Sequence, residues 1–250
     1  MLFNKDKCKV IHLGRNNLMY DYHLGNDPLI KVDSEKDLGV YLHKSLTPSL
    51  HIAEAVKKAN MKLGQLLRTV TYRDRTHFVK LYKQHVRCHL EYTVQAWSPW
   101  LKRDIDMLEA VQRRAVRCIH GLHGSYEEKL RQIGLPSLFE RRRRGDMIQT
   151  FKIINQFDDV DPAVWFTFAA DGHRPTRGNT EVSGDGSMNN RLTLKGVTPP
   201  PSTEVRRNFF SQRVIQPWNE LPEQVKRSVS LNSFKNQYDK LYAQHYEQCS

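Results

Sequence analysis

The sequence predicts an α+β protein that is mainly α-helical. Two patterns support this class. In the first 45 residues, short apolar stretches alternate with turns rich in Gly, Asn and Asp, as expected for short strands. From Ser49 onwards, apolar residues recur at intervals of three and four, which is the period of an amphipathic helix. We therefore expect a small antiparallel strand unit, then a helical bundle, a flexible linker and a helical C-terminal segment.

The strand unit is expected over residues 1–45. Its central feature is a hairpin signature, in which Tyr20, Tyr22 and Leu24 alternate with polar residues before a Gly-Asn-Asp-Pro turn. The expected strands are 8–13, 20–24, 29–32 and 38–42, with turns at 25–28 and 33–36.

The helical segments follow from their apolar periodicity. The expected helices span 49–70, 74–97, 104–119, 126–133, 137–155 and 233–245, with Asp104 as the cap of the third. Residues 171–203 lose this period and contain three consecutive prolines, as in a flexible linker. The chain thus divides into a strand unit at 1–45, a helical domain at 49–156, an irregular region with the linker at 157–203, and a C-terminal extension at 204–250.

Composition restricts the class of protein. The chain has 250 residues, of which 39% are hydrophobic and 26% charged, as in folded domains. No stretch approaches the roughly 20 apolar residues of a membrane span, and the charged N-terminus is unlike a signal peptide. The four cysteines are scattered without a C-x-x-C pair, which fits neither a disulfide scaffold nor a zinc ribbon. We expect an intracellular protein, nuclear or cytoplasmic, with no membrane partner.

The charge distribution predicts a polyanionic partner. The net charge is +12, and residues 51–103 alone carry 11 cations against three acids. Lys and Arg on helices can neutralise successive phosphates of a nucleic-acid backbone, whereas an ordinary solvated helix surface mixes both signs. The candidate phosphate contacts in this region are Lys57, Lys58, Lys62, Arg68, Arg73, Lys80, Lys83 and Arg87.

A second basic cluster consists of Arg113, Arg114 and Arg117 together with the arginine run at 141–144. Helical spacing places Arg113 and Arg117 on one face, where both could hold a phosphate. Four consecutive arginines are also typical of a nuclear-import tract, although that pattern is weak.

Two motifs resemble metal sites, but each lacks a feature that such a site requires. Asp158 and Asp159 follow a phenylalanine, as in a polymerase metal site, but they trail a helix and precede a proline instead of forming a hairpin between strands, so an acidic helix-ending turn is favoured. His85 and His89 are four residues apart beside Cys88, yet the glutamate of a zinc-protease helix is replaced by Val86. We expect histidines of a core or interface, no metal ligands and no catalytic residues.

Several motifs, taken in order, resemble the downstream part of the reverse transcriptase of non-LTR retrotransposons, in particular the jockey-like LINE group. The matching segments are FNKDKCKV (3–10), HLG (12–14), KDLGV (36–40), HI (51–52), VKKAN (56–60), YRD (72–74), LYK (81–83), VRCHLEY (86–92), QAWSP (95–99), LE (108–109), VQRRA (111–115), LPSL (135–138), NFFSQR (208–213), WN (218–219) and LP (221–222).

The resemblance implies a role for each segment. Residues 1–45 would be the end of the palm, 49–156 the thumb, and the rest a C-terminal extension. Lys7 would lie near nucleotide phosphates, and Leu38, Gly39 and Val40 would form the primer grip. The expected partner is an RNA or DNA template-primer duplex.

The resemblance also implies what the chain lacks. The family's catalytic aspartates, which hold Mg²⁺ in the full-length enzyme, lie upstream of Phe3, so we expect a truncated fragment that binds a duplex but does not polymerise and contains no cofactor. Two alternatives stay open. The catalytic segment of an active reverse transcriptase could be supplied from upstream, in an incomplete gene model or as a separate N-terminal chain, or the sequence could be a relic without a selected role.

Overall fold

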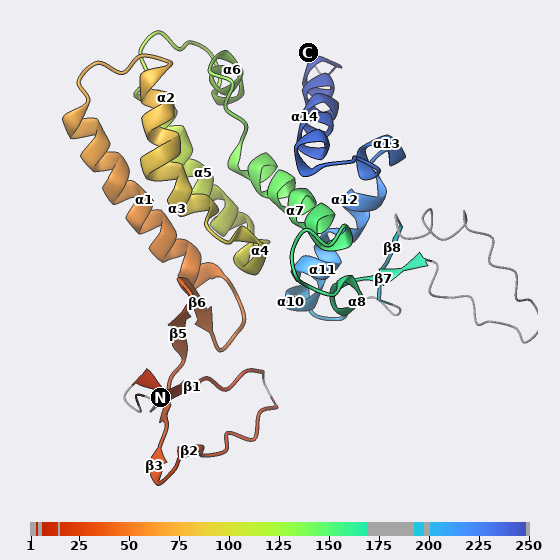
Figure 1. The fold of residues 1–250 in the computed structure, drawn as a ribbon. Coiled ribbons are helices and arrows are strands. Elements are labelled where there is room, and N and C mark those ends of the chain that lie inside the picture. The colour runs from red at the N-terminus through yellow and green to blue at the C-terminus, as the bar shows by residue number, and fades with distance from the viewer. Residues whose placement is uncertain (1–3, 5–6, 15, 170–192, 198–200, 249–250) are drawn as a thin grey trace, which may run out of the picture. The chain divides into compact units, whose positions relative to one another are not determined.

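The computed structural model describes residues 4, 7–14, 16–169, 193–197 and 201–248, and within the last helix the side chains up to Tyr242 (Figure 1). It confirms the predicted class, since helices dominate and short strand pairs lie near the N-terminus. In the described part of the chain, no helix is both long and apolar enough to cross a membrane.

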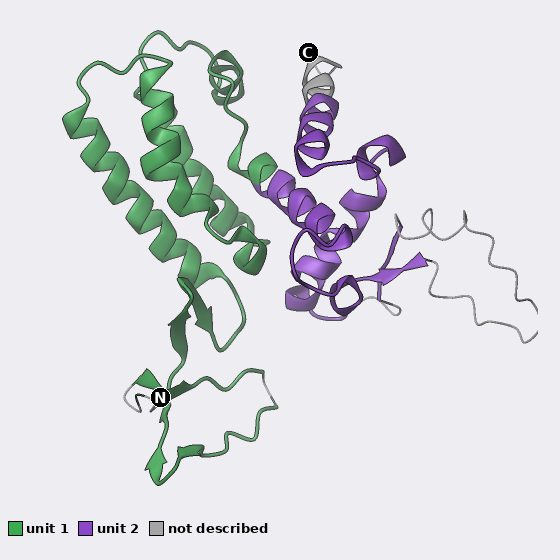
Figure 2. Ribbon diagram, in the orientation of Figure 1, with its two compact units in different colours: residues 1–141 green, residues 142–250 purple. Residues whose placement is uncertain are grey.

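The chain forms two compact units, residues 1–141 and 142–250 (Figure 2). The boundary falls inside the helix predicted at 137–155, although the predicted helical domain, 49–156, includes the whole of this helix. The physical reason is that Met147, Phe151 and Ile153 pack in the core of the second unit. The C-terminal half of this helix therefore belongs with the extension that follows it in sequence.

Unit 1 begins with short strands joined in pairs. The strands are β1 (Lys9–Val10), β2 (His23–Leu24), β3 (Asp27–Pro28), β4 (Ile30–Lys31), β5 (Ser34–Asp37) and β6 (Val40–His43). The predicted hairpin is present as the antiparallel pair β2–β3, which turns at residues 25 and 26. In contrast to the antiparallel unit expected, β1 and β4 pair in parallel.

The second hairpin, β5–β6, differs from the prediction. The segment predicted as a turn at 33–36 is largely strand β5, and the turn consists of Leu38 and Gly39. Both turn residues have positive φ, 44° and 90° respectively, as a two-residue hairpin turn requires. Because leucine rarely adopts this conformation, the turn carries no recognisable sequence signal.

The helices of unit 1 match the predicted segments closely. They are α1 (Ser49–Thr69), α2 (His77–Tyr82), the π-helix η2 (Lys83–Arg87), α3 (Cys88–Glu91), α4 (Val94–Trp97), α5 (Lys102–Arg117), α6 (Tyr126–Gln132) and α7 (Leu138–Ile154), which crosses into unit 2. The segment predicted as one helix at 74–97 is interrupted after α3, where Thr93 has a φ of 50°.

Helices α1 and α5 run parallel to each other. Near their starts, Ser49 Oγ donates to Asp104 Oδ2 at 2.6 Å, and further along Arg114 Nη1 donates to Asn60 Oδ1 at 3.1 Å. Asp104 is thus not the helix cap that was predicted. The cap position is Leu101. Asp104 is the third residue of the first turn of α5, where its buried side chain accepts the hydrogen bond from Ser49.

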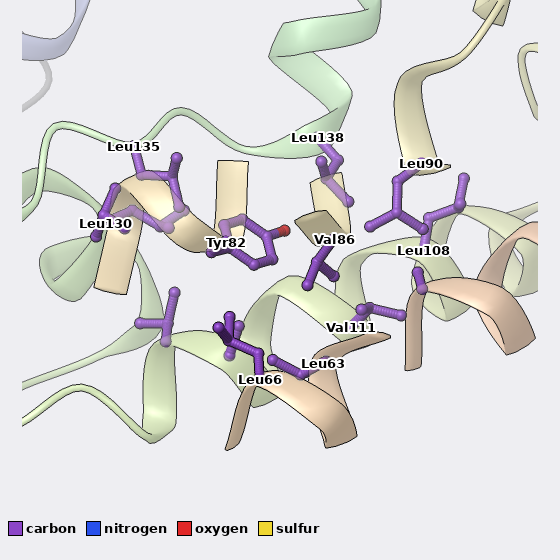
Figure 3. Packing of buried hydrophobic residues seen from close by; sticks show 14 of the residues in the cluster. Leu63, Leu66, Tyr82, Val86, Leu90, Leu108, Val111, Leu130, Leu135 and Leu138 are labelled. Carbon is purple, nitrogen blue, oxygen red and sulfur yellow. The ribbon is translucent and has the colours of Figure 1, made fainter. Parts of the chain in front are cut away.

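Apolar side chains from α1, η2, α3, α5 and the α6–α7 connection fill the core of unit 1 (Figure 3). The helix α2–η2–α3 contributes Phe78, Tyr82, Val86 and Leu90, which lie four residues apart and are all buried. The π-helical turn keeps these four on one side, because its wider turn absorbs one residue more than an α-helix would.

A buried polar network ties this core together. Tyr82 donates its hydroxyl hydrogen to Gln112 Oε1 at 3.0 Å, and Gln112 Nε2 donates to the carbonyl of Pro136 at 3.0 Å. Glu109 accepts from the Tyr126 hydroxyl at 2.5 Å and from the backbone N–H of Leu138 at 3.1 Å, at the start of α7. The network therefore fixes α2, α5, α6 and the beginning of α7 relative to one another.

Unit 2 has an aromatic core. Its elements after α7 are α8 (Pro162–Trp165), β7 (Thr167–Phe168), β8 (Leu194–Lys195), α10 (Glu204–Arg207), α11 (Phe210–Arg213), α12 (Ile215–Asn219), α13 (Glu223–Lys226) and α14 (Leu231–Gln248). Phe151, Trp218 and Phe234 are fully buried at its centre, where Phe151 and Phe234 stack at 4.3 Å.

Part of the region predicted as irregular chain and linker, 157–203, is ordered. It contains α8 and the antiparallel pair β7–β8, and the Asn219 side chain bonds both the N–H and the carbonyl of Leu194 at 2.9 Å. The remainder of the linker, residues 170–192 and 198–200, lies outside the described residues.

Candidate nucleic-acid interface

Helix α1 exposes its cations on two flanks. Its buried side consists of His51, Ile52, Ala55, Ala59, Leu63 and Leu66. Lys57 and Lys58 are adjacent, so they project about 100° apart around the helix. The predicted basic stripe is therefore two groups of cations on either side of the exposed surface of α1.

The first flank faces α3 and consists of Lys58 and Lys62, one helical turn apart. Burial lowers the pKa of the His89 imidazole on α3, and the charges of Lys58 and Lys62 lower it further. This direction agrees with the position of both lysines on the side of α1 that faces α3. We refer to Lys58 and Lys62 as the α3-flank lysines.

The second flank faces α5 and consists of Lys57, Arg68 and Arg114, the α5-flank cations. Arg114 is held by its hydrogen bond to Asn60. The Arg68 guanidinium lies over Gly64, where a β-carbon would be 3.8 Å from Nη1. Arg114 and Arg68 thus come from different helices and present their charges on the outer surface of the α1–α5 pair.

The remaining predicted cations have different surroundings. Arg117 and Lys80 are exposed, and Arg113 lies over the Tyr126 ring at 4.9 Å. Arg73 and Arg87 have internal roles: Arg73 Nη2 donates to the carbonyl of Leu67 at 3.0 Å, at the end of α1, and Arg87 pairs with Glu91 at 3.4 Å.

Most of these cations lack an acidic neighbour. Of the eleven predicted phosphate contacts, two lie within salt-bridge distance of an acid among the described residues: Lys57, 3.7 Å from Glu54, and Arg87. Burial and then the neighbouring charges of Arg87 and Arg141 lower the pKa of Lys83. The surface of the bundle therefore carries positive charge that its own acids do not neutralise.

The predicted primer-grip residues form the tip of the β5–β6 hairpin. Leu38 is 85% exposed, whereas Val40 is buried in the core of unit 1. The Tyr92 hydroxyl donates to the Leu38 carbonyl at 3.1 Å, and a β-carbon on Gly39 would lie 3.0 Å from the Tyr92 ring. An exposed apolar residue is thus presented on a turn that the bundle holds in place.

Tyr92 and His51 also hold this hairpin. Both belong to segments that carry the resemblance, but no role was predicted for either residue. The His51 Nδ1 atom accepts the Tyr41 backbone N–H at 3.3 Å, and the ring lies 4.8 Å from that of Trp97. Trp97 Nε1 donates to the carbonyl of Tyr92 at 2.6 Å. The signal for them is weak, because an aromatic residue on a helix normally indicates core packing.

Lys7 is exposed, and its backbone N–H donates to the carbonyl of Asn4 at 3.2 Å. The structure does not bring it together with the cations of α1.

The arginine run at 141–144 is not a free basic cluster. Arg141 makes two hydrogen bonds of 2.9 Å to Glu91, and Arg144 makes two to Asp239 at 2.6 and 2.8 Å. Arg142 is buried. These arginines contribute to the internal packing of each unit, which was missed because the acids that pair with them are distant in sequence.

The structure also shows the surroundings of the two candidate metal motifs. Asp158 follows α7 and accepts from Gln149 and from Lys152, at 2.7 and 3.1 Å, which fits the predicted helix-ending turn. His85 is exposed and His89 is half-buried, so His85 is not a core residue. Within the described ranges, no three His, Cys, Asp or Glu side chains are placed to share a metal ion.

Comparisons with known proteins give no match: no family model, curated protein or solved structure is significantly similar to the chain.

Proposed function

We propose that this chain is the downstream part of a non-LTR retrotransposon reverse transcriptase and that its helical bundle binds the sugar-phosphate backbone of a template-primer duplex. The observation that carries the proposal is the set of candidate cations on α1 and α5, of which, among the described residues, Lys57 alone lies within salt-bridge distance of an acid. Such cations gain most from phosphates, because no internal ion pair has to be broken first.

The arrangement of the two flanks supports binding to a backbone. The α3-flank lysines and the α5-flank cations lie on both sides of α1, as a rod-shaped polyanion lying along this helix would require. Contacts of this kind recognise phosphates and not bases, so the binding is tolerant of sequence.

The β5–β6 hairpin supports the second part of the proposal. Leu38 is exposed at a turn fixed by Tyr92, in the position that the resemblance assigns to the primer grip. An exposed leucine with a positive φ costs stability, and such strain is commonly retained where a residue has a function.

The experiment measures fluorescence anisotropy of a labelled RNA–DNA duplex at several salt concentrations. With about five phosphate contacts, log K is expected to fall with log salt with a slope of roughly −4 to −5. The variant Lys57→Gln/Lys58→Gln/Lys62→Gln is expected to weaken binding to duplexes of any sequence and to flatten the slope by up to about 3.

A charge-matched control separates this surface from net charge alone. The variant Arg207→Gln/Arg227→Gln/Lys240→Gln removes three exposed cations from unit 2, and it is expected to leave the slope unchanged. Equal losses in both triple variants, or a wild-type affinity that does not respond to salt, would contradict the proposed interface.

A further inference from the structure

Unit 2 carries an aromatic pair at its surface that the proposed duplex interface does not use. The rings of Trp165, at the end of α8, and Phe209, just before α11, are parallel within 3° with their centroids 6.3 Å apart. Phe209 is 54% exposed and Val164 is 77% exposed. Phe209 and Val164, the residue before Trp165, thus face solvent, whereas Trp165 is half-buried.

The core holds this pair in a fixed orientation. Trp165 packs edge-on against Phe210 at 6.1 Å, and Phe210 is only 4% exposed. Phe209 occupies the cap position of α11 with an extended backbone, and its N–H donates to the carbonyl of Arg206 at 3.3 Å. Buried neighbours therefore set the ring planes before any ligand binds.

Two exposed cations belong to the backbone segments that carry the rings. Arg206 is one helical turn before Phe209, and Lys195 pairs across the β7–β8 ladder with Thr167, two residues after Trp165. Neither forms a salt bridge with an acid in the described part of the chain. Trp165 is half-buried and supports the exposed ring of Phe209 from one side. An exposed aromatic ring with cations nearby in the chain is an element with which proteins bind unpaired nucleotides, the ring stacking on a base and the cations on phosphates.

We propose that Trp165 and Phe209 form a stacking platform for unpaired bases of single-stranded nucleic acid, with Arg206 and Lys195 binding the adjoining phosphates. The platform accepts any base, because every base has a flat aromatic face. This proposal is independent of the duplex interface, since it concerns other residues, another unit and another form of nucleic acid.

The test uses the full chain and labelled oligothymidylate, with oligouridylate as the RNA arm. Phe209→Ala is expected to weaken binding by about five- to tenfold, because stacking on an aromatic residue contributes at least that factor per base. Phe209→Trp is expected to retain the affinity of the wild type. Comparison of the two oligomers shows whether the platform prefers ribose or deoxyribose.

Two controls isolate stacking. Phe157→Ala removes another phenylalanine of unit 2 with nearly the same exposure, 52%, and is expected to leave single-strand affinity unchanged. An abasic oligomer of the same length keeps the phosphates without the bases, and Phe209→Ala is expected to have no effect on its binding.

The proposal is overturned if Phe209→Ala binds oligothymidylate as well as the wild type, or loses affinity equally for the abasic oligomer. An unchanged single-strand affinity would assign the pair to a protein-facing apolar surface instead. Duplex affinity in the same variants is expected to stay constant, so failure of the platform and failure of the duplex interface give different results. Matched thermal unfolding of Phe209→Ala and Phe209→Trp excludes loss of folding as the cause.

Discussion

Unit 1 contains 24 cations and 15 acids, a net charge of +9, whereas unit 2 contains 15 and 12, a net charge of +3. The difference is greater in how the charges are arranged. In unit 2, six cations form salt bridges among the described residues: Arg143, Arg144, Lys152, Arg207, Arg213 and Arg227. Among the eleven candidate contacts of unit 1, two do. Elsewhere in unit 1, five more described cations form salt bridges: Lys9, Lys31, Lys44, Arg103 and Arg141. The cations that remain available to a polyanion are therefore concentrated on the candidate surface of the helical bundle and do not extend over the whole of unit 1.

The largest expected effect concerns the buried pair of unit 2. Arg213 makes two hydrogen bonds of 2.9 Å to Asp146. Burial raises the pKa of Asp146, and the hydrogen bonds and charge of Arg213 offset part of this rise. Arg213→Met is expected to destabilise unit 2 by about 3–5 kcal/mol, because it removes both hydrogen bonds that Arg213 donates to a buried carboxylate. Urea denaturation measures the loss.

Two variants test this explanation. Arg207→Met breaks an exposed pair with Glu204 and is expected to cost no more than about 1 kcal/mol. The double variant Asp146→Leu/Arg213→Met removes both charges and is expected to recover most of the stability. If it remained as unstable as Arg213→Met, lost packing, and not the loss of hydrogen bonds to the buried carboxylate, would be the cause.

The second prediction divides the exposed cations of unit 1 by flank. Lys58→Gln/Lys62→Gln and Arg68→Gln/Arg114→Gln each remove two charges, one pair from each side of α1. For a duplex lying along α1, each variant is expected to flatten the salt slope by about 1.8, since each contact contributes about 0.9. Salt titrations by anisotropy measure both. A slope that changes in only one variant would restrict the interface to that flank.

The third prediction concerns the turn of the β5–β6 hairpin. Gly39→Ala is expected to destabilise the hairpin by about 1–2 kcal/mol, because Gly39 has a φ of 90° and the added carbon meets Tyr92. Gly25→Ala is the matched control, since Gly25 also has a positive φ, 66°, but no neighbour within 4 Å of the added carbon. Hydrogen exchange of β6 amides measures the effect. Equal losses at both glycines would mean that the Tyr92 contact contributes nothing.

The smallest expected effect is a dependence on pH. Burial lowers the pKa of His51 below its ordinary value of 6.5, and the charge of Lys36 lowers it further. The neutral ring is the form that accepts the Tyr41 N–H, so hairpin docking is fully stable above pH 6.5 and weakens as pH falls through the lowered pKa. Exchange of the Tyr41 amide from pH 7 to 5 measures this. His51→Asn keeps an acceptor without titrating, and it is expected to abolish the pH dependence.

Much of the fold follows from sequence periodicity. The helices at α1 and α5 were predicted within a few residues, because each has a single apolar side against one core. The β5–β6 register was not predicted, since Ser-Glu-Lys-Asp is a polar run typical of a turn and Leu38 is not a turn residue. Backbone pairing across the ladder, which leaves no trace in the side-chain pattern, determines this strand.

The sequence predicts which region of the candidate site is basic, but not which of its cations are free to bind a ligand. Residue counts identify the basic region, but they do not show that Arg73 bonds a helix-end carbonyl or that Arg141 pairs with Glu91, 50 residues away. The aromatic pair of Trp165 and Phe209 was missed for the same reason. Contacts between residues far apart in sequence decide which polar and aromatic side chains remain available.

The π-helical turn between α2 and α3 marks a position where one residue can be deleted from the chain. Over the twelve residue-to-residue steps from Phe78 to Leu90, a regular α-helix would rotate the side chains out of phase by about 120°. Removing the exposed Gln84 would leave eleven steps and reduce that drift to about 20°. Phe78, Tyr82, Val86 and Leu90 would then share one face of an uninterrupted α-helix. This turn is therefore a site where a one-residue deletion preserves the core, in a bundle whose other helices would be rotated out of register by the same change.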